Sequence, residues 1–209
     1  LVWQISNFHH HRSGPRRSLR IGLLEDLRWQ ETTKSHAAFF VFGLLAIMGL
    51  YQLLTFTLHR AFRGGLWLAV LCFAILSRHL ASEGYIGSNF DSNLTRIFLM
   101  SMKLEYMSFC IAVPSFVSFM HQLFPYRRPE LVQKVVWGFS SFYIVLILVT
   151  GPIIFGQFLP IYQLFSMGVI IWIGGYIAHA ARTGNRWALS SFLGFVVLAF
   201  GTIADIASS

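Results

Sequence analysis

Six long apolar runs dominate this sequence, and they constrain its fold more than any other feature. Each is close to the roughly 18–20 residues that an α-helix needs to cross the core of a bilayer. In lipid the backbone must satisfy its own hydrogen bonds, and the runs lack the two-residue alternation of a membrane β-barrel. The sequence therefore predicts an all-α polytopic membrane bundle with helices at residues 37–58, 65–81, 97–123, 135–154, 159–181 and 187–206.

The few charged residues define how the runs are oriented. They make up 11% of the chain, against about 25% in soluble domains. Basic residues follow the first, third and fifth runs, and the positive-inside rule places these loops in the cytoplasm. The loops hold Arg60, Arg63, Arg127, Arg128, Lys134, Arg182 and Arg186. We therefore expect a multi-pass membrane protein whose N-terminal segment lies outside the cytoplasm. The basic residues form no stripe with interleaved aromatics, so no nucleic acid is expected as a partner.

The segment before the first run has a different composition. Residues 1–24 alternate large and polar side chains around the turn signal Ser13-Gly14-Pro15, which predicts the terminal strands of a β-domain. Residues 25–36 are polar and are expected to form a helical juxtamembrane linker, and residues 37–209 form the bundle. No signal peptide is visible, and both ends look cut, so we expect a piece of a longer protein.

Three stretches together resemble the bacterial seven-transmembrane receptors with diverse intracellular signalling modules. The first is Trp3-Gln4-Ile5-Ser6-Asn7-Phe8, followed by Ser13-Gly14 and Leu19-Arg20-Ile21-Gly22, which is similar to the closing strands of that family's exported jelly-roll domain. The second is Gly43-Leu44-Leu45-Ala46-Ile47-Met48-Gly49-Leu50-Tyr51-Gln52-Leu53-Leu54, which is similar to the family's first membrane helix. The third is Leu104-Glu105-Tyr106 with Leu123-Phe124-Pro125, at the two ends of the third run.

The resemblance implies a receptor. The family has an exported β-sandwich sensor that binds a ligand such as a carbohydrate, seven helices, and a cytoplasmic output module such as a histidine kinase or a nucleotide cyclase. This chain departs from that pattern, because it has six candidate spans and no output module. The expected function is a transmembrane domain that relays ligand binding to a module outside this chain. A homodimer is expected, because such modules usually work as pairs.

Four charged or titratable residues fall inside the second and third runs. Arg78 and His79 lie near the outer end of one, and Lys103 and Glu105 near the outer start of the next. Charges in a bilayer are costly, so they tend to pair or to line a cavity. Glu105 is predicted to pair with Arg78 or Lys103. The alternative is that Arg78 and Lys103 extend to the outer headgroups and Glu105 faces water.

Proline and the aromatic residues give further expectations. Pro114 lies in the middle of the third run, where it removes one hydrogen bond and predicts a kink, either static or acting as a hinge. Most Trp and Tyr residues near the ends of runs are interpreted as interface anchors, and Trp172 as deeper. These aromatic residues are Trp67, Trp137, Trp172, Trp187, Tyr85, Tyr126 and Tyr162.

No chemical motif is found. Cys72 and Cys110 lie in apolar runs and are interpreted as small buried side chains. The run His9-His10-His11 points in several directions and is not expected to bind metal. No nucleophile–base set, phosphate loop or pair of catalytic carboxylates occurs, so no cofactor or catalytic residue is predicted.

Two other functions compete with the receptor. A transporter or channel would favour internal repeats, broken helices or polar groups near the bilayer centre, whereas the charged residues here cluster near the outer surface. A membrane-embedded enzyme would need a catalytic constellation, which the sequence does not offer. An output kinase or cyclase would lie outside this chain.

Overall fold

The described part of the chain consists of five helices. The structure is a computed structural model, and it describes residues 24–60, 63–82, 94–123 and 129–182. The helices are α1 (Leu24–Leu58), α2 (Gly64–Ser82), α3 (Leu94–Leu123), α4 (Pro129–Val149) and α5 (Pro152–Arg182). The predicted terminal β-strands, the His9-His10-His11 run and the sixth span at 187–206 lie outside the described residues.

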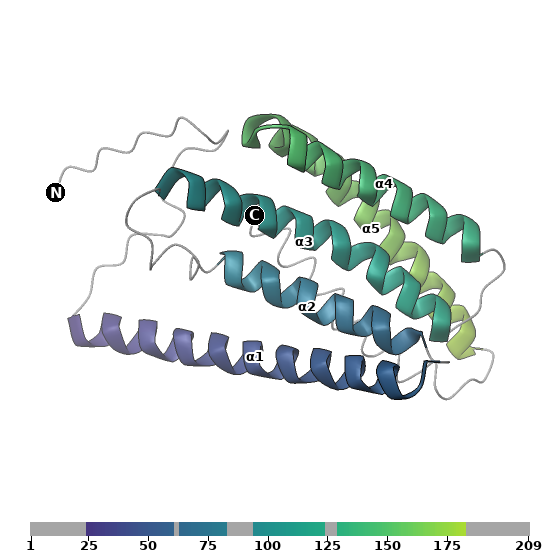
Figure 1. The fold of residues 1–209 in the computed structure, drawn as a ribbon, viewed down its shortest axis with the longest axis horizontal. Coiled ribbons are helices and arrows are strands. Elements are labelled where there is room, and N and C mark those ends of the chain that lie inside the picture. Colours follow the sequence, from purple (N-terminus) through teal and green to yellow (C-terminus); the bar gives the residue numbers. More distant parts are fainter. Residues whose placement is uncertain (1–23, 61–62, 83–93, 124–128, 183–209) are drawn as a thin grey trace.

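The helices run up and down beside one another, as Figure 1 shows. α1 packs on α2, α2 on α3, and α3 on α4, while α5 contacts both α3 and α4. Within the described residues α1 has no other helix neighbour. α3 is thus the central element of the bundle, and α1 lies at its edge.

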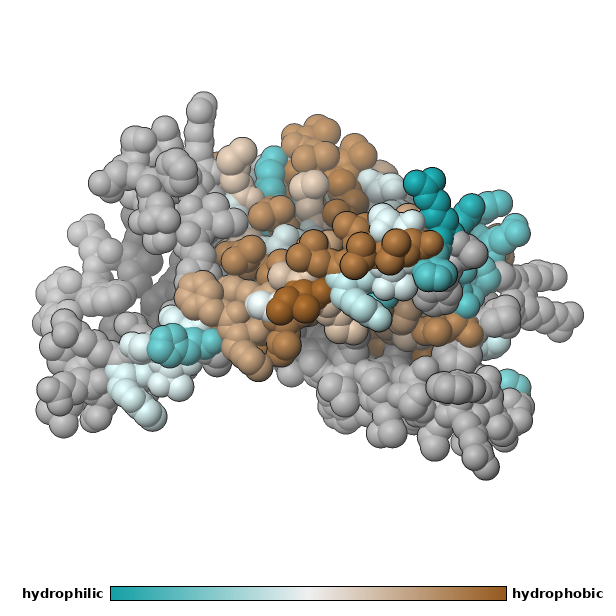
Figure 2. Space-filling view, turned by 60° about the horizontal axis from the view of Figure 1, so that its bottom comes forward, coloured by the Kyte–Doolittle hydropathy of each residue, from teal (hydrophilic) through white to brown (hydrophobic). Residues whose placement is uncertain are grey.

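Four of the five helices are long and apolar enough to cross a membrane. These segments are Ala38–Leu58, Gly64–Ser82, Glu130–Val149 and Pro152–His179. Apolar side chains cover the middle of the face in Figure 2, and hydrophilic ones lie toward its ends. Such an exposed apolar band suits contact with lipid.

α3 is not among these four segments, although residues 97–123 were predicted to span. Its sequence is more polar because it lies inside the bundle rather than against lipid. Three of its serines, Ser108, Ser115 and Ser118, are buried. Each donates a hydrogen bond to a carbonyl one turn earlier in α3. A helix surrounded by others can carry hydroxyl groups that a lipid-facing helix would expose at a cost.

Two helix boundaries differ from the prediction. α1 is continuous from Leu24, so the polar segment 25–36 and the first span form one helix of 35 residues. The break between α4 and α5 falls at residues 150–151, not at residues 155–158 as predicted. Pro152 lies at the first position of α5, where a backbone N–H would have no partner within the helix, so its absence costs no hydrogen bond. Ile153 and Ile154 continue the apolar run, which hid this break.

α1 and α2 approach closely at two glycines. A Cβ atom added at Gly49 would lie 3.1 Å from the ring of Phe73, and one at Gly65 would lie 3.2 Å from the carbonyl oxygen of Gln52. Gly43 has nothing within 4 Å of such an atom. Small residues at Gly49 and Gly65 therefore let the two backbones pack together, as is common between membrane helices.

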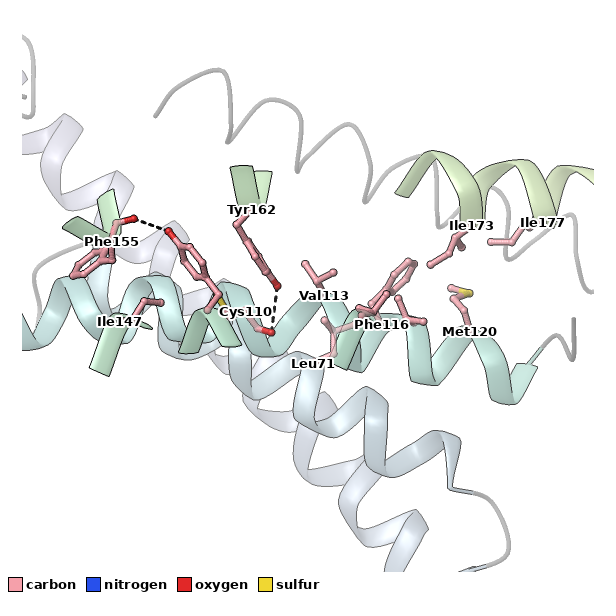
Figure 3. Packing of buried hydrophobic residues seen from close by; sticks show 13 residues of the cluster. Leu71, Cys110, Val113, Phe116, Met120, Ile147, Phe155, Tyr162, Ile173 and Ile177 are labelled. Carbon is pink, nitrogen blue, oxygen red and sulfur yellow. Dashed lines mark hydrogen bonds between the residues drawn. The ribbon is translucent and has the colours of Figure 1, made fainter. Parts of the chain in front are cut away.

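The buried core lies between α3, α4 and α5. Figure 3 shows its side chains pointing from these helices toward one another. The cluster comprises Leu71, Cys110, Val113, Phe116, Val117, Met120, Val136, Tyr143, Ile147, Phe155, Tyr162, Ile173 and Ile177. Only Leu71 comes from α2, so this buried apolar cluster lies mainly between α3, α4 and α5.

Candidate functional site

Pro114 is fully buried in α3, and the helix continues through it without a break. Proline has no N–H, so the carbonyl of Cys110, four residues earlier, loses its usual helical donor. The Tyr162 hydroxyl, from α5, approaches this carbonyl oxygen at 3.4 Å (Figure 3). A side chain of another helix thus partly replaces the missing N–H as a hydrogen-bond donor to the Cys110 carbonyl.

Ser140 of α4 extends this contact to a third helix. Its Oγ atom lies 2.9 Å from the Tyr162 hydroxyl oxygen. Either hydroxyl can be the donor in this contact, and Tyr162 can donate to the Cys110 carbonyl when Ser140 donates to Tyr162. Both side chains are fully buried. The contact therefore joins α3, α4 and α5 at the level of Pro114.

Aromatic rings surround the hydrogen-bonded hydroxyl of Tyr162. Tyr162 stacks on Tyr143 at a centroid distance of 5.0 Å and meets Phe109 edge-on at 5.4 Å. Tyr143 donates a hydrogen bond of 2.7 Å to the Phe155 carbonyl oxygen at the start of α5 (Figure 3). The rings lower the local dielectric constant, which strengthens the buried hydrogen bonds.

A second polar contact lies one turn further along α3. The Ser118 hydroxyl donates to the Pro114 carbonyl at 2.8 Å and accepts hydrogen bonds of 3.0 Å from Gln133 Nε2 and Trp137 Nε1 of α4. The Trp137 ring also packs on Trp67 of α2, with centroids 5.5 Å apart. This contact therefore joins α3 to α2 and α4.

The four residues of the predicted charge cluster lie at two different places in the structure. Arg78, His79 and Glu105 line one cavity between α2 and α3. Lys103 is not among the described lining residues; its Nζ donates a 3.1 Å hydrogen bond to the carbonyl of Leu148, at the end of α4. Terminal carbonyls of a helix lack internal donors, and a cation there is favoured by the helix dipole. The pairing of Glu105 with Arg78 stays a prediction.

The cavity has a volume of about 470 Å³, within the range of small-molecule sites. Its walls are the apolar side chains of α2 and α3, with Val169 and Ile170 of α5. The Arg78 guanidinium carbon lies 5.2 Å from the centroid of the Phe109 ring, a cation–π contact. The His79 ring is near Phe42 of α1, with centroids 6.3 Å apart. The cavity is thus a largely apolar space with charged groups at one end.

Several of these residues were missed or misassigned by the sequence analysis. Tyr162 was interpreted as an interface anchor, yet it is 0% exposed and sits beside Pro114. Ser118 and Ser140 could have been singled out from the sequence, because a hydroxyl group inside an apolar run needs a hydrogen-bond partner within the bundle. Trp172, interpreted as deeper and as either a core or a lipid-facing side chain, is 41% exposed.

The described residues show no other chemical centre. Among residues 24–60, 63–82, 94–123 and 129–182, no three His, Cys, Asp or Glu side chains gather as metal ligands would. Cys72 and Cys110 are buried free thiols, as predicted from their apolar surroundings. The site is therefore a set of packing and polar contacts along α3 together with a cavity.

These features define a multi-pass membrane protein with a helical bundle. A family model described as 7TM diverse intracellular signalling matches residues 35–209, most of the chain. The chain therefore belongs to this family, which confirms the resemblance seen in the sequence and gives it a role in transmembrane signalling. Comparisons with curated proteins and with solved structures returned no match.

Proposed function

We propose that this chain is the transmembrane relay of a receptor in a bacterial inner membrane. An exported sensor domain joined before α1 binds a small molecule such as a carbohydrate. Binding shifts the helices between two packings, and their cytoplasmic ends pass the change to an output module, a kinase or a nucleotide cyclase. The receptor works as a homodimer with its N-terminal segment outside the cytoplasm.

The observation that carries the proposal is the series of polar contacts along α3. At the outer end the Arg78 guanidinium of α2 packs on the Phe109 ring of α3. In the middle the Cys110 carbonyl contacts Tyr162, and further in Ser118 binds α4. One buried helix is thus joined to α2, α5 and α4 at successive levels. A displacement of its outer end would have to remake contacts near its inner end.

The geometry at Pro114 supports movement within α3. The proline leaves the helical hydrogen-bond ladder open at the Cys110 carbonyl. The substitute contact from Tyr162, at 3.4 Å, is long for an O–H···O bond. A helix that lacks one backbone hydrogen bond, and has only a weak contact from another helix in its place, can change that contact as it bends. This favours the hinge interpretation of Pro114 over a static kink.

A distance measurement in the full chain tests the relay. Cysteines replace His59 and Glu130, which are both exposed and lie at the predicted cytoplasmic end, and each carries a nitroxide label. The protein is reconstituted in lipid nanodiscs, and the distance distribution is recorded by pulsed electron paramagnetic resonance. Glu105→Gln at the other end should shift the distribution by about 2 Å, the scale of helix shifts in signalling proteins.

A matched substitution controls for nonspecific effects. Gln157 is exposed near the same outer end, on α5, and is not among the described lining residues of the cavity. Gln157→Ala should leave the distribution unchanged. The relay proposal is contradicted if Glu105→Gln, in a folded protein, also leaves the inner distance where it was.

A further inference from the structure

We propose that the cavity between α2, α3 and α5 binds a neutral single-chain amphiphile, with its alkyl chain directed toward the middle of the membrane. This goes beyond the relay, because it gives the bundle a ligand site of its own. The inference starts from the way polar and apolar groups are ordered along the cavity.

Polar lining residues gather at one end of the cavity. They are Arg78, His79, Ser82, Glu105 and Ser108, in the last turns of α2 and the outer part of α3. The opposite end is lined by Leu71 and Phe116. At about 1.5 Å per residue, the helical distance from Leu71 to Ser82 is about 16 Å. A ligand that fills this space must be elongated, polar at one end and apolar over the rest.

The charges at the polar end select the head group. Arg78 and Glu105 carry opposite formal charges, so together they sum to zero. A pair with no net charge does not compensate the cost of moving a charged head from water into a region of low dielectric constant. A neutral head that both donates and accepts hydrogen bonds can interact with the guanidinium and the carboxyl group together.

The serine hydroxyl groups are consistent with such a head. Ser82 donates to the His79 carbonyl at 3.2 Å, and Ser108 donates within α3, where the Leu104 carbonyl lies at 2.5 Å and the Glu105 carbonyl at 3.0 Å. Their protons are therefore engaged within the helices, and their oxygens are left as acceptors. Glycerol hydroxyls would donate to these acceptors and accept from Arg78. A monoacylglycerol has this head and a single chain, and its volume is compatible with a site of about 470 Å³.

Photolabelling of the chain in nanodiscs tests the proposal. The probe is a monoacylglycerol with a twelve-carbon chain that ends in a diazirine. Labelling should concentrate at the inner end of the cavity, on Leu71 and Phe116, and a 100-fold excess of unlabelled monododecanoylglycerol should reduce it at least tenfold. Even labelling of lipid-facing residues that the excess does not reduce would overturn the proposal.

Two substitutions sharpen the test. Ala112→Phe fills the cavity and should lower labelling at least tenfold. Gly168→Phe is the control, because a Cβ atom there meets nothing within 4 Å and residue 168 is not among the described lining residues. Equal labelling of both variants would contradict the site. The competition on the unmodified chain keeps the test valid if Ala112→Phe does not fold.

The head group is tested by changing its charge partner. Glu105→Gln removes the negative charge and leaves the positive charge of Arg78, which favours an anionic head. The ratio of the affinities for dodecanoate and monododecanoylglycerol, measured by competition with the probe, should therefore rise at least tenfold. A preference that stays the same would overturn the assigned head group. Binding is measured without any output, so its failure would leave the relay proposal intact, and a failed relay would leave the binding result intact.

Discussion

The α1–α2 pair and the α3–α4–α5 unit are held together in different ways. α1 packs on α2 through close contacts at Gly49 and Gly65, and most of its apolar side chains stay exposed. α3, α4 and α5 share buried hydrogen bonds and stacked rings around Tyr162. Buried hydrogen bonds join the helices of the second unit, whereas the absence of a side chain at two glycines lets α1 approach α2 closely. The comparison teaches that buried polar contacts hold the centre of the bundle, whereas close apolar packing at glycines holds its edge.

The largest effect should come from removing the central ring. Tyr162→Ala leaves a cavity and ends the contacts to Ser140 and Cys110, so we expect it to lower the free energy of unfolding by about 3–5 kcal/mol. Tyr51→Ala on α1 is the matched control, because Tyr51 is 64% exposed; its change should stay within about 0.5 kcal/mol. Unfolding in a detergent titration measures both. Similar losses for the two variants would remove the contrast between centre and edge.

The glycine contact at the edge should give the next largest effect. Gly49→Leu forces a side chain against Phe73 and Cys72, so α1 and α2 must separate, at a cost of about 1–3 kcal/mol. Gly43→Leu, on the same helix but with open space, should be close to neutral. Detergent unfolding again gives the values, and an equal response of the two glycines would mean that the close approach is unimportant.

A double-mutant cycle isolates the contact between Tyr162 and the helix at Pro114. Tyr162→Phe removes the hydroxyl, and we expect a loss of about 0.6–1.7 kcal/mol, as measured for hydrogen bonds between membrane helices. Pro114→Ala supplies an N–H to the Cys110 carbonyl, so in that background the same substitution should cost less. The coupling energy should be about 0.5 kcal/mol or more. A value of zero would show that Tyr162 does not substitute for the missing donor.

The smallest effect is expected at the end of α4. Lys103→Met removes the hydrogen bond to the Leu148 carbonyl and the favourable charge near the helix terminus, so stability should fall by about 0.3–1 kcal/mol. Lys103→Arg should retain most of it. Hydrogen exchange of the last turn of α4 is the more sensitive measurement, and unaltered protection in Lys103→Met would argue against a capping role.

The sequence predicts the existence of the helices better than their ends or partners. Apolar runs of spanning length identified all five described helices, because lipid leaves a backbone few other choices. The break at residues 150–151 was hidden by Ile153 and Ile154, since hydropathy does not register a turn between two apolar helices. Lys103 was one of two partners predicted for Glu105, with extension to the headgroups as the alternative. In the structure it donates to the Leu148 carbonyl, a backbone partner that has no sequence signal.

The interior of the site was the least predictable part. Arg78, His79 and Glu105 were singled out from their cost in lipid, and the structure brings them to one cavity. Tyr162 was misplaced because its depth depends on where α5 begins and on how the helix is rotated. Packing between helices decides such rotation, and one sequence does not reveal it.

Impermeant thiol labelling of intact cells tests the central claim, a bundle that crosses the membrane back and forth, most directly. Cysteine is placed at His59, after α1, or at Gly151, between α4 and α5; both positions are exposed, and the native Cys72 and Cys110 are buried. The account predicts that Gly151→Cys reacts from outside, whereas His59→Cys reacts only after the membrane is opened. Labelling of both positions from the same side would contradict it.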